Sequence, residues 1–254
     1  MNTMVKYFLL LIITLGAGIL HAQKNFEIRY LGNMGIAVSH NDSTILIDAL
    51  HDFYESDYLQ TDEQALKAIL AKQAPYKKII AIAVTHRHSD HFDSAVVTRV
   101  MNVHGSTLLV SGGQTMSLLS SDLQKKFTKV TDSLTIRIND RLKLHLYRIP
   151  HTYAARHAAV ENYRVEITWN NFRLVHLGDA DEKDEAIDLL KEKPGVMVVP
   201  SWYLSDKGTE LLNKVKPGKI LVTHISPADN ALYKNEKLKS EVISFRKYGD
   251  ILKL

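Results

Sequence analysis

The stretch Thr85-His86-Arg87-His88-Ser89-Asp90-His91-Phe92-Asp93 directly follows the apolar run Lys78 to Val84. The β-branched residues of that run predict a buried strand, so the polar stretch begins at the carboxyl end of the strand. In an extended segment, side chains two residues apart point to the same side, so His86 and His88 can bind one ion together. The turn that follows would direct the next ligands toward a second ion.

Within six residues of this stretch, four side chains are metal ligands by type: His86, His88, Asp90 and His91. Imidazole nitrogen combined with carboxylate oxygen suits zinc, and also iron or manganese. A lone histidine at this place would indicate no more than a solvated loop. Four such ligands together favour a metal site.

The pattern His86-x-His88-x-Asp90-His91 after a hydrophobic strand resembles the metallo-β-lactamase-fold hydrolases. The motif is typical of a superfamily and does not specify one reaction. The resemblance extends over residues 26 to 224. It implies an α/β fold of the four-layer αββα sandwich type and a site for two divalent ions, with zinc favoured and iron or manganese as alternatives.

Composition fits one soluble domain. Of 254 residues, 45% are hydrophobic and 24% are charged, and no linker-like segment divides the chain. We therefore expect a single domain over residues 23–254. The net charge of +4 is small and the lysines are scattered, so a small-molecule substrate is expected and nucleic acid is not.

Residues 1–22 have the pattern of a secretory signal peptide. Lys6 supplies the positive charge, residues 7–19 form an apolar core, and Leu20-His21-Ala22 would be the processing end. The apolar core is shorter than the roughly 20 residues that span a membrane, so a secreted or periplasmic protein without a stable membrane span is expected. An uncleaved membrane anchor stays open, because Leu20 is an imperfect residue for the cleavage site.

Alternating apolar residues and turn signals predict an antiparallel meander at the start of the domain, followed by helices and strands in alternation. The expected strands cover residues 26–31, 35–39, 43–48, 78–85, 107–110, 134–138, 142–149, 163–169, 172–177, 196–199 and 219–223. The expected helices cover residues 61–72, a segment that begins at the N-cap Asp93, 113–119, 182–193 and 209–215.

Further metal-type residues follow other predicted strands: Asp48, His151, Asp179 and His224. Ligands of α/β sheets bind beyond the carboxyl ends of the strands, so these residues are expected to share one cleft with the His86 loop. An acid that closes a hydrophobic strand, such as Asp48, is costly to bury without a partner. The resemblance implies that Asp48 orients a metal-binding imidazole.

The resemblance also implies the ligand sets. His86, His88 and His151 would bind the first ion, Asp90, His91 and His224 the second, and Asp179 would bridge the two. The family's usual Gly-His-Thr-Pro-Gly segment is absent, and the chain has Ile149-Pro150-His151-Thr152-Tyr153 instead. His151 is the expected third ligand of the first ion, and His157 remains an alternative ligand or a substrate-side residue.

Such a site implies hydrolysis by a hydroxide that two ions share, acting on an ester, a lactone or a phosphodiester. Asp179 and Asp90 would be the catalytic carboxylates, and either Asp90 or a metal-bound water would deliver the leaving-group proton. The chain has no cysteine, so disulfides are excluded and a zinc β-lactamase of the best-known type is not expected.

The segments around His151 and Asp179 are similar to the branch that contains ascorbate-phosphate lactonase-like proteins. Trp202 and Tyr203 would contact substrate or pack in the core. The alternative function is a metal-binding but inactive member of the family that acts as a binding or scaffold protein.

Overall fold

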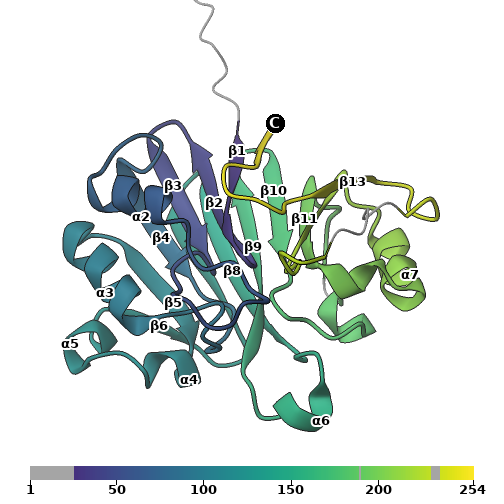
Figure 1. Ribbon diagram of the computed structural model, residues 1–254, viewed down its shortest axis with the longest axis horizontal. Helices are drawn as coiled ribbons and strands as arrows, with labels where there is room; N and C mark the ends of the chain where they lie inside the picture. Colours follow the sequence, from purple (N-terminus) through teal and green to yellow (C-terminus); the bar gives the residue numbers. More distant parts are fainter. Residues whose placement is uncertain (1–25, 189, 230–234) are drawn as a thin grey trace, which may run out of the picture.

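The computed structural model describes residues 26–188, 190–229 and 235–254, and the predicted signal peptide lies outside these ranges. Two seven-stranded sheets form the centre of the molecule (Figure 1). In spatial order, the first contains β14 (Ile251–Lys253), β1 (Glu27–Gly32), β2 (Gly35–His40), β3 (Ser43–Ile47), β4 (Lys78–Ala83), β5 (Leu108–Gly112) and β6 (Phe127–Val130). The second contains β13 (Glu241–Ser244), β12 (Lys219–Thr223), β11 (Val196–Pro200), β10 (Phe172–His176), β9 (Asn162–Trp169), β8 (Leu142–Ile149) and β7 (Ser133–Asn139).

Helices cover the outer faces of both sheets (Figure 1). The first sheet is covered by α2 (Glu63–Leu70), α3 (Ser94–Val103), α4 (Gly113–Met116) and α5 (Ser121–Gln124), and the second by α7 (Asp206–Val215). The short helix α6 (Ala154–His157) follows β8. Two segments form 3-10 helices, η2 (Asp184–Ala186) and η3 (Ser201–Leu204). The predicted αββα sandwich is confirmed.

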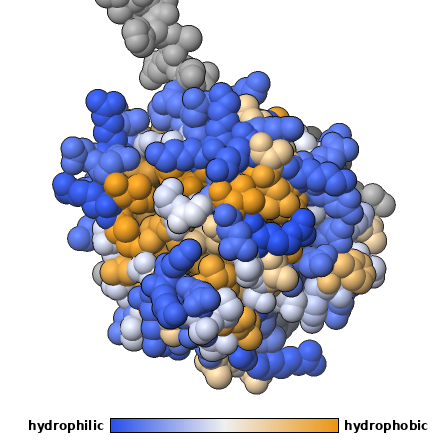
Figure 2. Space-filling view, turned by 90° about the vertical axis from the view of Figure 1, so that its left-hand side faces the viewer, coloured by the Kyte–Doolittle hydropathy of each residue, from blue (hydrophilic) through white to orange (hydrophobic). Residues whose placement is uncertain are grey.

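Three apolar clusters hold these four layers together. The largest lies between the sheets and includes Tyr30, Ile47 and Tyr163, all fully buried. A second lies between the first sheet and its helices, where Ile69 and Val97 turn inward. The third lies between the second sheet and α7. Figure 2 views the side that carries α2 to α5 and shows hydrophobic areas bordered by hydrophilic residues.

Strand direction brings the predicted ligands to one edge. The first three strands form the predicted antiparallel meander, and β3, β4 and β5 then run parallel. In the second sheet β8 and β10 are both antiparallel to β9, and β10, β11 and β12 run parallel. The carboxyl ends of β8, β10 and β12 therefore lie at the same edge of the second sheet.

Two predicted helices differ from the structure. Residues 182–193 were expected to form a helix, but only the 3-10 turn η2 forms among the described residues there. The fully buried Arg164 donates from Nη1 to the backbone oxygens of Ala186 and Asp188, at 2.9 and 2.8 Å, so an arginine from β9 binds carbonyl groups of this segment. The helix predicted over residues 113–119 ends at Met116.

Three short strands were not predicted. These are β6, β13 and β14, and each is an edge strand of its sheet. Among the described residues, no helix combines the length and the apolar character needed to cross a membrane.

Candidate metal centre

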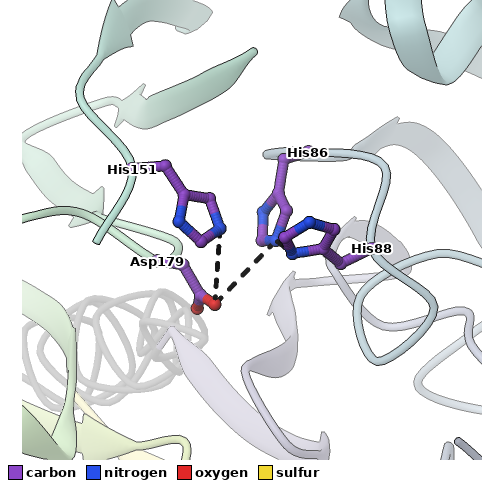
Figure 3. Close-up of side chains that lie close together, drawn as sticks. All are labelled: His86, His88, His151 and Asp179. Carbon is purple, nitrogen blue, oxygen red and sulfur yellow. Dashed lines mark hydrogen bonds and ion pairs between the residues drawn. The ribbon is translucent and has the colours of Figure 1, made fainter. Parts of the chain in front are cut away.

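Seven side chains from both halves of the chain form two groups that share one carboxylate. The first group is His86, His88, His151 and Asp179, and the second is Asp90, His91, Asp179 and His224. Within each group the candidate ligand atoms lie within 4.8 Å of one another. Figure 3 shows the first group, with Asp179 and His151 on one side and the His86 loop on the other.

The first group converges on one oxygen of Asp179. Its Oδ2 lies 3.9 Å from His86 Nε2 and 3.8 Å from His151 Nε2 (Figure 3). His86 Nε2 also lies 3.0 Å from His88 Nδ1. Three imidazole nitrogens and one carboxylate oxygen thus face a common point.

The second group converges on the other oxygen of Asp179. Its Oδ1 lies 3.2 Å from His91 Nε2 and 3.6 Å from His224 Nε2. Asp90 Oδ2 lies 3.4 Å from each of the same two nitrogens. Asp179 therefore directs one oxygen to each group, which is the arrangement of a bridging carboxylate.

Asp48 connects ligands of both groups without joining either. Its Oδ2 accepts a hydrogen bond from His91 Nδ1 at 2.9 Å and another from the Thr85 hydroxyl at 2.6 Å. Because the Thr85 hydroxyl donates to Asp48, its oxygen is left to accept from His86 Nδ1, 3.0 Å away. Both rings therefore carry the proton on Nδ1 and turn Nε2 toward the site.

Two further hydrogen bonds fix ligand orientation. His151 Nδ1 donates to the Thr152 carbonyl at 2.7 Å, which leaves Nε2 free to bind a cation. Asn33 Nδ2 donates to Asp90 Oδ2 at 2.9 Å and to the Asp90 carbonyl at 3.1 Å. Asn33, at the β1–β2 turn, is therefore part of the support of the site.

The unsatisfied polar atoms fit two divalent cations. Among the described residues, four buried candidate ligand atoms have no hydrogen-bond partner: Nε2 of His91, His151 and His224, and Oδ1 of Asp179. Unpaired buried polar atoms are rare, and each one calls for a specific partner. A donor set of imidazole and carboxylate that meets at two points supplies ligands for zinc, iron or manganese.

The electrostatics favour bound cations as well. Burial lowers the pKa of His86 well below its ordinary value, and burial together with His151 lowers the pKa of His88 to about 4. Both imidazoles are therefore neutral at pH 7 and keep a lone pair for a metal. Burial opposes ionisation of Asp179, but His91 and His224 hold the pKa of its carboxyl well below its ordinary value.

Gly178, after β10, lies against the side chain of Thr85, after β4, so the two sheets approach closely beside the candidate ligands. Gly178 has φ of +54°, and a Cβ built on it would lie 2.7 Å from Cβ and Oγ1 of Thr85. The predicted Gly178-Asp179 pair thus needs glycine for its left-handed backbone and for the space beside Thr85.

Of the two candidates for the third ligand of the first group, the structure places His151 in the group. The ring of His157, on α6, lies 4.8 Å from the His151 ring and 4.9 Å from the His88 ring. His157 is not among the residues of either group. His157 therefore lies beside the first group but outside it.

A cavity of about 940 Å³ opens onto both groups. Trp202 lines it, and its ring lies 5.0 Å from the His224 ring. Tyr203 does not line it: this residue is fully buried in the third cluster, and its hydroxyl donates to the Asp181 carbonyl at 2.6 Å. Of the two open interpretations of Tyr203, core packing is the one that the structure shows.

Three further histidines of the described residues lie near backbone carbonyls outside both groups. His51 is buried, with Nε2 3.4 Å from the Gly32 carbonyl, and His176 Nε2 lies 2.9 Å from the Met34 carbonyl. His104 Nε2 lies 2.8 Å from the Ile69 carbonyl. Sequence reasoning assigned no role in the site to Asn33, to Thr85, or to Tyr58, which lines the cavity with its ring 5.1 Å from the His224 ring. None of the three is a metal ligand by type.

Comparison with known families decides the relationship. The family model described as "Beta-lactamase superfamily domain" matches residues 43–234, about three quarters of the chain. The chain belongs to the β-lactamase superfamily. The matched range contains every member of the two groups, from His86 to His224. No curated protein matches the sequence significantly.

Solved structures show the same fold at low identity. A protein from Veillonella parvula described as a possible metal-dependent hydrolase has 18% identity and a TM-score of 0.63, with 91% of this chain and 99% of that chain covered. The metallo-β-lactamase fold protein YhfI from Bacillus subtilis has 15% identity and a TM-score of 0.62, with the same coverage. An isothiocyanate hydrolase from Delia radicum gut bacteria has 14% identity and a TM-score of 0.61, with 89% and 98% covered.

The superfamily and the two His/Asp groups together identify the chain as a metal-dependent hydrolase, as predicted from the sequence.

Proposed function

We propose that this superfamily member is an exported hydrolase that uses two divalent ions to cleave a small ester, lactone or phosphodiester. One observation carries the proposal: Asp179 directs Oδ2 to the first group and Oδ1 to the second. A single-ion site would not need a buried carboxylate with ligands of both groups around it. Zinc is the favoured metal, with iron or manganese as alternatives, and His/Asp ligands without cysteine support a lactonase-like hydrolase over a β-lactamase.

Two ions held by the first group and the second group would supply a hydroxide nucleophile at neutral pH and stabilise negative charge on the substrate. The protein's own residues supply the geometry. Asp48 and Thr85 hold His91 and His86 in the tautomer that binds a cation. Asn33 donates to Oδ2 and to the backbone carbonyl of Asp90 and so holds this carboxylate beside His91 and His224, where it would deliver the leaving-group proton.

Export is proposed from the pattern of residues 1–22, and it implies a secreted or periplasmic protein. A small-molecule substrate fits a cavity of about 940 Å³ that reaches the metal groups. The segments around His151 and Asp179 support a place near the ascorbate-phosphate lactonase-like branch.

The experiment measures metal content and hydrolysis together. The purified protein should contain about two equivalents of metal by mass spectrometry and should hydrolyse members of an ester, lactone and phosphodiester panel. Asp179→Asn removes the shared charge, so its metal content should fall to one equivalent or less and its turnover should fall at least 100-fold.

The matched control is Asp181→Asn. This carboxylate lies two residues further on and pairs with Lys183 at 2.7 Å, outside both groups. It should keep metal and turnover. Full turnover in Asp179→Asn would refute the mechanism, and two equivalents of metal without turnover on any probe would favour the alternative, an inactive binding or scaffold protein.

A further inference from the structure

The cavity above the two groups has two chemically different ends. Both ends are formed by residues that bind no metal, and the inference drawn from them names the substrate class of the proposed hydrolase and so rests on that function. The end beside the first group is basic, and the end beside the second group is aromatic and acidic.

Two arginines form the basic end. Arg87 lies between the ligands His86 and His88, and Arg156 precedes His157, whose ring lies 4.9 Å from the His88 ring. Both arginines line the cavity and are exposed. Within the described parts of the chain, neither guanidinium has a hydrogen bond or an ion pair, in contrast to Arg164 and Arg173, which both bind Glu166. Both guanidinium groups are free to bind an oxyanion.

Two aromatic rings form the opposite end. Tyr58 and Trp202 come from different halves of the chain, and each meets the His224 ring edge-on, at 5.1 and 5.0 Å between centroids. The Trp202 ring is held by a hydrogen bond from Nε1 to the Ala180 carbonyl. An apolar group placed beside His224 would therefore lie between two aromatic side chains.

The charge of the lining residues differs between the two ends of the cavity. Asp57, next to Tyr58 in the sequence, lines the cavity, so it repels a second negative charge from the aromatic end. The basic end attracts the same charge. At the rim, Tyr54, Leu118 and Tyr153 also line the cavity and are exposed, which favours a ligand with an apolar part.

We propose that the substrate is a small amphiphilic anion. Its apolar ring lies against Tyr58 and Trp202, its carboxylate or phosphate binds Arg87 and Arg156, and its scissile bond lies between them, above Asp179. Guanidinium groups recognise both kinds of oxyanion, so the experiment includes one of each.

The experiment measures binding and turnover separately on the metal-loaded protein. Calorimetry with 2-naphthoate, naphthalene-2-phosphonate and the neutral 2-naphthamide tests binding. Arg87→Gln and Arg156→Gln should each weaken binding of one or both anions about tenfold and change binding of the amide less than twofold. The anion whose binding weakens more in the arginine variants shows whether the site prefers a carboxylate or a phosphate-like group. Tyr58→Leu should weaken all three probes about equally.

The turnover arm compares 1-naphthyl hemisuccinate with neutral 1-naphthyl butyrate. The arginine variants should raise KM for the hemisuccinate about tenfold and leave KM for the butyrate unchanged. Arg99→Gln, an exposed arginine of α3 outside the cavity, is the control and should change nothing. Metal content is measured in every variant. If Arg87→Gln loses metal, the proposal is judged on Arg156→Gln alone.

The two proposals fail in different ways. One outcome is that the arginine variants selectively lose anion binding while neither the parent protein nor any variant turns over a probe. That outcome would support the amphiphilic anion as the ligand and refute the hydrolase. Turnover with equal effects of the arginine variants on charged and neutral probes would keep the hydrolase and overturn the amphiphilic anion.

Discussion

Thr85 binds no metal, yet three parts of the site depend on it. Its backbone N–H and its hydroxyl both donate to Asp48, at 2.7 and 2.6 Å, and the hydroxyl oxygen accepts from His86. Its side chain also fills the space beside Gly178, immediately before the shared carboxylate. The position of Asp179 relative to His86 is thus set by one small side chain.

Gly178→Ala should disrupt this arrangement. The new Cβ would lie 2.7 Å from Thr85 in a left-handed backbone, so we expect a loss of about 2–4 kcal/mol of unfolding free energy from strain and overpacking. Metal affinity should fall as well, because Asp179 moves. Urea unfolding and metal titration measure the two effects.

Two other glycines separate the causes of that loss. Gly105 has an ordinary φ and open space around it, so Gly105→Ala should have little effect. Gly249 has φ of +86° and equally open space, so Gly249→Ala reports the cost of the backbone conformation alone. A Gly178→Ala protein no less stable than Gly249→Ala would contradict the role of the Thr85 contact.

His51 should make stability depend on pH. Burial, with a smaller contribution from His91, lowers its pKa from 6.5 to about 4. The unfolded chain therefore binds the proton first, so the stability from the neutral ring is complete above pH 6.5 and is lost as the pH falls toward 4. Between pH 7 and 5 this amounts to about 2 kcal/mol.

Urea unfolding with chelator present measures this slope without a contribution from metal release. His51→Gln should show less loss of stability between pH 7 and 5 than the parent protein. An unchanged slope would mean that other buried histidines, such as His176, are responsible.

The candidate ligands and one of their supports, Asp48, could be predicted from sequence, whereas the supports Asn33 and Thr85 could not. Each predicted ligand follows a strand whose apolar residues mark its end, and the chain places those ends at one edge. Asn33 and Thr85 carry no such signal, because a turn asparagine and a strand-end threonine are common. Their partners lie 57 and 37 residues away in sequence, so only the folded chain shows the contacts.

At the scale of elements, helix α3 fixes the far end of the ligand loop. The predicted N-cap Asp93 accepts a hydrogen bond from Val96 N at 2.8 Å, and its own N–H donates to the Leu50 carbonyl. Asp90 and His91 lie within three residues of this cap. The start of the helix therefore limits the movement of two ligands.

Asp93→Ala should cost about 1 kcal/mol of stability, because an N-terminal N–H loses its acceptor. It should also weaken the metal affinity of the second group several-fold. Asp62→Ala is the matched control, since Asp62 caps α2 through Gln64 N at 2.9 Å, away from the site. If both variants lowered metal affinity equally, the proposed link between the cap and the ligand loop would be wrong.

The elements missed from sequence share a physical cause. Strands β13 and β14 have four and three residues, too few to show a period, and they exist because edges of distant strands accept them. The helix expected over residues 182–193 has good helical composition, but Arg164 takes two carbonyls of the segment. Tertiary contacts decided the outcome in both cases.

At the scale of the whole molecule, each metal group takes ligands from both sheets. The loops after β4 supply His86, His88, Asp90 and His91, and the loops of the second sheet supply His151, Asp179 and His224. Each bound ion stabilises only the folded chain, by about 2.7 kcal/mol at a free concentration of 100 times Kd, so two ions contribute about 5 kcal/mol. For a chain of this size, removal of both ions by chelator should lower Tm by about 10–20 °C.

Thermal unfolding with and without chelator checks this expectation. Asp179→Asn should lose most of the chelator-dependent shift, whereas Asp181→Asn should keep it. A Tm that does not respond to chelator in the parent protein would show that the ions contribute nothing to the docking of the sheets.

The shared carboxylate has one more consequence. Neither sheet alone offers more than two ligands to the first group before the other sheet adds its own, so fragments divided between β6 and β7 should bind metal weakly when separate and tightly when recombined. A misaligned partner would move Asp179 away from both points of convergence at once. Metal occupancy would then serve as a chemical signal that the two halves of the chain have met in the correct register.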